Sequence, residues 1–101
     1  MLGLRIPALS LATVVARTDG FIEAEVDQDI VALNVERGSC YGLNRVGSRI
    51  WKLLSRPTRI DDLCTILLAE YEVLPDVCGR EVLALLEELR AEGMIITVDE
   101  K

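Results

Sequence analysis

Residues 39–54 read Ser-Cys-Tyr-Gly-Leu-Asn-Arg-Val-Gly-Ser-Arg-Ile-Trp-Lys-Leu-Leu, and this stretch decides the fold. Asn44, near its centre, is a strong helix N-cap because its side-chain oxygen can accept hydrogen bonds from the free N–H groups of a first helical turn. The apolar residues after it recur at the spacing of one face of a half-buried helix. They are Val46, Ile50, Leu53 and Leu54. The stretch therefore predicts extended chain before Asn44, helices after it, and a groove between the two.

The residues before Asn44 predict a small antiparallel sheet. β-branched residues favour a first strand within 11–17. In residues 21–26, apolar side chains alternate with two glutamates, which predicts a strand with one wet face. Residues 30–35 and 40–43 supply two more strands, and Gly38 between them stands where a tight loop needs positive φ. We expect three to four strands, with residues 40–43 at an edge.

The residues after Asn44 predict three helices. The first starts at Asn44, the second at Thr58, and the third near Pro75, a residue that suits the first position of a helix. Gly93 is the expected C-terminal cap. The chain, residues 1–101, is therefore expected to form one α+β domain of winged-helix-like shape. Its sheet spans about 11–43 and its helices about 44–93.

Charge argues against nucleic acid and membrane as partners. The chain carries 11 basic and 17 acidic residues, a net charge of −6. Because affinity for nucleic acid comes largely from neutralised phosphates, this balance disfavours DNA or RNA, and it also disfavours anionic membrane surfaces. The third helix, which would enter a DNA groove in a winged-helix protein, is itself acidic. A winged-helix DNA-binding regulator remains the alternative from another functional class.

No catalytic or metal-binding constellation is found. The sequence has no histidine, no nucleophile beside a base, and no phosphate-binding glycine loop. Cys40, Cys64 and Cys78 lack the Cys-x-x-Cys spacing of zinc sites, and their odd number argues against a disulfide framework. We therefore predict a protein that is not an enzyme, that holds no cofactor or metal, and that keeps its cysteines reduced in the cytoplasm.

A basic cluster lies on the first predicted helix and the loop after it. Its members are Arg45, Arg49, Lys52, Arg56 and Arg59. The cluster is either a solvated helix face or a contact for an acidic protein or peptide segment. Whether it docks an enzyme stays open.

The edge strand carries the functional hypothesis. Tyr41 and Leu43 share one face and are expected to be core anchors, whereas Cys40 and Gly42 occupy the other face and are small. An edge presents unpaired N–H and C=O groups, which invite another strand. A foreign peptide, a second copy of the chain in an edge-strand homodimer, and a shielded edge are the three alternatives.

These segments together resemble the PqqD-type proteins. The resemblance rests on the run Gly38-Ser-Cys-Tyr-Gly-Leu-Asn44, on Val46–Leu54, and on the ending Val82–Ile95, and it covers about Phe21 to Ile96. Such proteins are RiPP recognition elements, which bind the leader of ribosomally made, post-translationally modified peptides. A free-standing module of this length is most similar to the separate leader-binding proteins of lasso-peptide biosynthesis.

The resemblance implies a non-catalytic adaptor. The leader would add as a strand to the edge, by β-augmentation, with its side chains toward the third helix. The implied peptide-binding residues are Ser39, Cys40, Tyr41, Gly42, Leu43, Val77, Arg80, Leu83 and Glu87. The implied partners are a leader segment and a transglutaminase-like leader peptidase or another modifying enzyme. Within the family, a chaperone partner of a radical maturase is the alternative.

Overall fold

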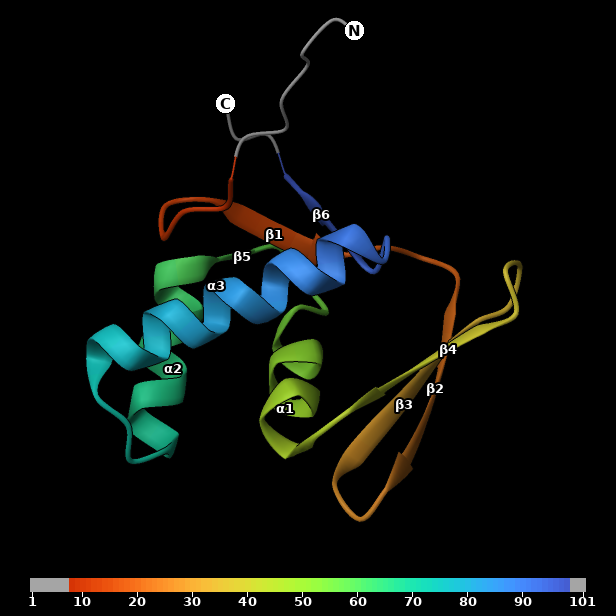
Figure 1. Ribbon diagram of the computed structural model, residues 1–101, viewed down its shortest axis with the longest axis horizontal. Coiled ribbons are helices and arrows are strands. Elements are labelled where there is room, and N and C mark those ends of the chain that lie inside the picture. The colour runs from red at the N-terminus through yellow and green to blue at the C-terminus, as the bar shows by residue number, and fades with distance from the viewer. Residues whose placement is uncertain (1–7, 99–101) are drawn as a thin grey trace, which may run out of the picture.

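The computed structural model describes residues 8–98, which form two small antiparallel sheets and three helices. The strands are β1 (Val14–Arg17), β2 (Phe21–Val26), β3 (Asp29–Asn34), β4 (Ser39–Leu43), β5 (Thr58–Arg59) and β6 (Ile95–Thr97). The helices are α1 (Arg45–Leu53), α2 (Ile60–Glu70) and α3 (Pro75–Ala91). In Figure 1 the β2–β3–β4 sheet projects from one side of the helices, and β4 leads directly into α1. The predicted α+β class is confirmed.

The predicted single sheet is wrong in one respect, because β1 does not join β2, β3 and β4. The strand orders are β2–β3–β4 and β5–β1–β6. Val15 of β1 pairs with Thr58 on one side and with Thr97 on the other. Residues 94–96 were expected to be extended, but these partner strands contain two and three residues, too few for a sequence pattern to show that they pair with β1. With a second sheet that uses both ends of the chain, the winged-helix description is only loose.

The helix starts follow the capping chemistry, with one shift. Asn44 caps α1 as predicted, and its Oδ1 accepts a hydrogen bond from Gly47 N at 2.8 Å. Pro75 is the first residue of α3. The second helix starts at Ile60, two residues later than predicted, because Thr58 and the residue after it pair with β1 instead. Gly38 has the predicted positive φ, at 67°.

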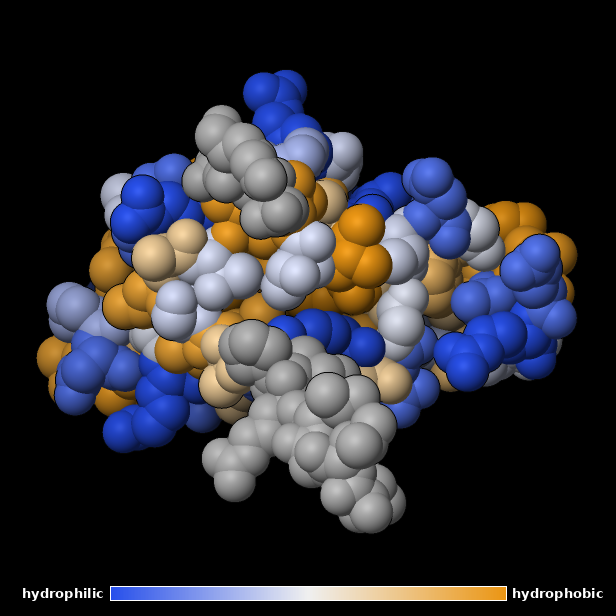
Figure 2. Space-filling model, turned by 90° about the horizontal axis from the view of Figure 1, so that it is seen from above, coloured by the Kyte–Doolittle hydropathy of each residue, from blue (hydrophilic) through white to orange (hydrophobic). Residues whose placement is uncertain are grey.

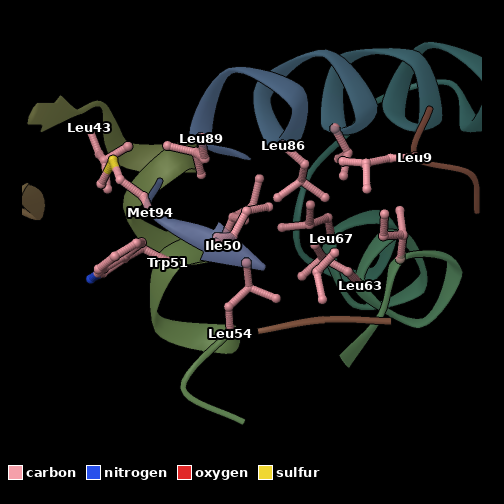
Figure 3. Close-up of a cluster of buried hydrophobic side chains, with 14 of the residues drawn as sticks. Leu9, Leu43, Ile50, Trp51, Leu54, Leu63, Leu67, Leu86, Leu89 and Met94 are labelled. Carbon is pink, nitrogen blue, oxygen red and sulfur yellow. The ribbon is translucent and has the colours of Figure 1, made fainter. Parts of the chain in front are cut away.

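The core lies between the three helices and the inner faces of both sheets (Figure 3). Trp51 is completely buried, as are Leu86 and Leu89 of α3. Val46 was expected on the buried face of α1 but is 41% exposed. It stands in the first turn, where α1 faces a hollow rather than packed side chains. Within residues 8–98, no helix is long and apolar enough to span a membrane.

Ser48 joins the end of β4 to the start of α1. Its buried hydroxyl accepts a hydrogen bond from Ile30 N at 2.7 Å and donates to Leu43 O at 3.1 Å. The hydroxyl thus bridges β3 and β4 at the last pair of their ladder, where Ile30 is opposite Leu43. This bridge fixes the direction in which β4 enters the helix.

We predict that Ser48→Ala lowers the free energy of unfolding by about 1–3 kcal/mol, because Ile30 N and Leu43 O then lose a buried partner. Chemical denaturation measures the change, and Ser55→Ala, at an exposed serine after α1, is the control. Equal stabilities of the two variants would show that the bridge contributes nothing.

β2 turns its two glutamates toward the helices, opposite to the expected wet face. Glu23 accepts a hydrogen bond from Trp51 Nε1 at 3.0 Å and pairs with Arg17 at 2.8 Å. Arg17 also lies 4.6 Å above the Trp51 ring, a cation–π distance. These contacts connect β1, β2 and α1, so the apolar residues that alternate with the glutamates face away from the helices. Ile22 and Val26 are accordingly 58% and 62% exposed.

Candidate functional site: an open edge strand beside a helix

The outer edge of β4 is open in the part of the chain that the structure describes. β4 pairs with β3 on one side, and residues 8–98 place no strand on the other. The N-terminal strand, which could have covered this edge, lies in the other sheet. The edge predicted from the sequence is therefore present and uncovered by residues 8–98.

The hydrogen-bonding groups of Cys40 and Gly42 point to the open side. In an antiparallel ladder, residues alternate between those that bond to the partner strand and those that do not. Ile30 N points toward β4, where it donates to the Ser48 hydroxyl. Leu43, which is opposite Ile30, therefore directs its own N–H and C=O groups toward β3. Cys40 and Gly42 alternate with Leu43, so their N–H and C=O groups point away from β3 and are available to a further strand.

The side chains of β4 alternate as predicted. Tyr41 and Leu43 face the core, and Leu43 is buried, whereas Cys40 and Gly42 are exposed on the opposite face. A β-carbon placed on Gly42 would have no atom within 4 Å. The outward face of β4 is therefore open at Gly42.

A stripe of α3 residues lies across from β4. Burial raises the pKa of Tyr41 most strongly, and the negative charges of Glu88 and Glu92 raise it further. At the start of β4, Glu92 and Tyr41 line one small hollow, and at its end Leu85 contributes to a larger one. One stripe of α3, at spacings of four, three and four residues, joins these points. It consists of Glu81, Leu85 and Glu88, followed by the C-capping residue Glu92, and with β4 it forms what we call the β4–α3 groove.

Two apolar hollows continue the β4–α3 groove toward α2. The first, of about 330 Å³, is lined by Asn44, Val46, Gly47, Ile50, Glu81, Val82 and Leu85. The second, of about 150 Å³, is lined by Val46, Leu67, Tyr71, Val73, Cys78, Glu81 and Val82. Because both share Val46, Glu81 and Val82, they are neighbours. A chain that left β4 in this direction could place apolar side chains in them.

The α3 residues predicted to line the site lie at different places. Val77 is one turn before Glu81 on the same stripe, so it is compatible with the groove. Leu83 packs partly against the core. It lies a full turn from Gly79, whose nearest neighbour is Leu11 of the N-terminal segment.

Glu87 and Arg80 also lie off the groove stripe. Glu87 accepts a hydrogen bond from Leu9 N at 2.8 Å and pairs with Arg90 at 2.6 Å, and these contacts lower the pKa of its carboxyl, the first most strongly. Arg80 is exposed. Val77 thus continues the groove stripe toward the N-terminal end of α3, whereas Arg80, Leu83 and Glu87 lie on other sides of the helix. The binding roles of all four residues stay predictions.

Three of the five residues in the basic cluster pair with neighbouring carboxylates. Arg49 pairs with Glu70 at 2.6 Å, and Lys52 pairs with Glu25 at 2.9 Å. Arg59 pairs with Asp61, two residues further along the chain, at 3.1 Å. These pairs leave less positive charge on this surface than the sequence suggested, which weakens its candidacy as a contact for an acidic partner.

The thiols show no arrangement for chemistry. Cys64 and Cys78 are buried, and burial with the neighbouring Cys78 raises the pKa of the Cys64 thiol to about 11. A thiol protonated at neutral pH is a poor nucleophile and metal ligand. Within residues 8–98 no three potential metal ligands lie close enough together to hold an ion.

An open edge strand that faces a helix across a groove is the architecture of RiPP recognition elements. The chain belongs to the PqqD family: the family model described as "Coenzyme PQQ synthesis protein D (PqqD)" matches residues 29–95. The matched segment includes β3, β4 and all three helices. A search of curated proteins found no match.

Two solved structures share this fold. One, "TbiB1 in Complex with the TbiA(beta) Leader Peptide", is 28% identical with a TM-score of 0.75, and the match covers 84% of this chain and 99% of that chain. The other, "Lasso peptide synthetase B1 complexed with the leader peptide", is 25% identical with a TM-score of 0.67, covering 81% and 96%. Both of those proteins were solved with a leader peptide.

Proposed function

We propose that this protein is a non-catalytic adaptor that binds the leader of a ribosomally made precursor peptide at β4. It then delivers the precursor to a leader peptidase or another modifying enzyme, in lasso-peptide biosynthesis. The observation that carries the proposal is the open edge of β4, whose free N–H and C=O groups face the β4–α3 groove. The leader-bound state of both solved relatives supports it.

The groove specifies the chemistry of the leader. Cys40 and Gly42 offer main-chain groups to an extended segment, so the leader residues bonded to them cannot be proline. The hollows beyond Leu43 suit bulky apolar side chains. Glu81, Glu88 and Glu92 favour leader residues that are basic rather than acidic.

Energetics require both kinds of contact. Ordering a flexible leader costs about 2–5 kcal/mol, while binding near 1 µM needs about −8 kcal/mol net. Backbone hydrogen bonds contribute only about 0.5–1.5 kcal/mol each. Apolar anchors in the hollows next to Leu85 and Val82 must therefore add to the bonds along β4.

A titration with the leader segment of a lasso-peptide precursor tests the proposal. Calorimetry should give saturable binding, and amide NMR should show the largest shifts and slowed hydrogen exchange at Cys40 and Gly42. A scrambled leader of the same composition is the control. Equal binding of both peptides, or shifts confined to another surface, would refute β-augmentation at β4.

The same measurements separate the alternatives. DNA recognition predicts a loss of about 10³-fold or more in affinity between about 50 and about 200 mM salt, whereas leader binding at an edge strand predicts a much smaller dependence. An edge-strand homodimer predicts a dimer that the leader dissociates, visible by sedimentation. Either result would replace the adaptor proposal.

A further inference from the structure

The outward face of the β2–β3–β4 sheet is apolar and uncovered by the helices. Its side chains follow from the strand registers, in which Ile22 is opposite Leu33 and Leu33 is opposite Cys40. The face consists of Ile22, Ala24, Val26, Val31, Leu33, Cys40 and Gly42. Ile22, Val26 and Leu33 are 58%, 62% and 38% exposed. Proteins that act alone rarely expose a contiguous apolar face of this kind.

We propose that this face docks a second protein, the enzyme that receives the precursor, through an apolar patch bordered by basic groups on that enzyme. This inference rests on the proposed function, because it names where the partner of that function binds. The face is on the opposite side of β4 from the groove, so a partner can cover it while the groove holds a leader.

Continuity with β4 favours the enzyme as occupant. A leader strand added beyond Cys40 and Gly42 extends the same sheet, and every second leader side chain then lies on the outward face. The docked enzyme would touch Ile22 and Leu33 of this protein and the leader side chains in one surface. The complete surface exists only when the leader is bound, so the enzyme distinguishes loaded from empty adaptor.

Charge argues against a second copy of the chain in this position. Asp27 and Asp29 border the face at the β2–β3 turn, whereas Glu36 and Arg37 stand together at the β3–β4 turn. A two-fold dimer buries the same patch on both partners and would join two chains of the same negative net charge. With a net charge of −6 per chain, a basic border on a different protein is the complementary arrangement.

Figure 2 shows apolar residues reaching the surface among hydrophilic ones at the end of the molecule that carries the β3–β4 turn in Figure 1.

The test compares Ile22→Lys with Leu74→Lys. Leu74 precedes α3, away from this sheet, and at 67% exposed it matches Ile22 in exposure. The probe is a purified transglutaminase-like leader peptidase of a lasso-peptide pathway. Its affinity is measured by biolayer interferometry for each variant, with and without leader. We expect Ile22→Lys to weaken docking of the loaded adaptor at least about tenfold, while Leu74→Lys leaves it unchanged. Leader affinity should stay within about twofold in both variants, since neither residue lines the groove.

Each outcome decides a separate claim. Equal docking of Ile22→Lys and wild type overturns this inference and leaves leader binding intact. If wild type binds no leader, the proposed function fails. In that case the affinity of the enzyme for the empty adaptor is compared between Ile22→Lys and Leu74→Lys, and this comparison still shows whether the face binds the enzyme. Self-association of wild type that Ile22→Lys abolishes would assign the face to a homodimer and overturn the inference.

Discussion

Gly42→Pro is expected to reduce leader affinity by about 5- to 150-fold without unfolding the protein. Proline removes the outward N–H of Gly42. A leader carbonyl buried in the β4–α3 groove then has no hydrogen-bond donor, at a cost of about 1–3 kcal/mol. β4 is an edge strand, where proline is tolerated because the lost N–H did not serve β3. Calorimetry with the leader measures the affinity, and circular dichroism checks the helical content.

Gly42→Ala is the matched control for this change. A β-carbon at Gly42 meets no atom within 4 Å and leaves the N–H in place, so affinity should stay close to that of wild type. If Gly42→Pro folds normally and binds as tightly as Gly42→Ala, the leader does not add to β4. The groove would then have to bind it through side chains alone.

The strand–helix junction could be predicted from the sequence because its determinants are local. Asn44 caps α1 through its own side chain, and Gly38 adopts positive φ within its own loop. Hydrophobic periodicity also placed Ile50 and Leu54 in the core. Such features depend on residues within one or two turns of each other, so a single sequence contains the information.

Features that depend on distant partners could not be predicted. β1 showed its β propensity, but its neighbours at residues 58–59 and 95–97 are far away in the chain. The alternation in β2 defined two faces without showing which one faces inward. The inward choice depends on Glu23 meeting Trp51 and Arg17.

The same limit explains the predicted site residues on α3. Periodicity separates the buried stripe from the rest of the helix, but two further sides remain, and tertiary packing decides which one meets β4. The N-terminal segment occupies one side, where Leu9 N donates to Glu87. The groove therefore falls on the side of Glu81, Leu85 and Glu88. Their spacing of four and three residues could have indicated from the sequence that they share one side of the helix.

Leu85→Ala and Leu83→Ala distinguish these two sides of α3. Both leucines are partly buried and pack against the core, so both variants should lose similar stability, about 1–2 kcal/mol. Leu85 also lines the hollow at the end of β4, and we expect Leu85→Ala to weaken leader binding about 10- to 30-fold through lost apolar contact. Leu83→Ala should bind within about twofold of wild type, because Leu83 is on the side of α3 that Leu11 approaches.

Thermal melts and calorimetry on both variants make the comparison independent of folding. Matched melting temperatures with a loss of affinity only in Leu85→Ala place the leader between β4 and the stripe of Glu81 and Glu88. A loss only in Leu83→Ala would place the leader on the side of Glu87, as predicted from the sequence, and would require residues 8–11 to move aside. Because the leader cannot occupy both sides of α3 at once, the pair of variants decides where the peptide lies.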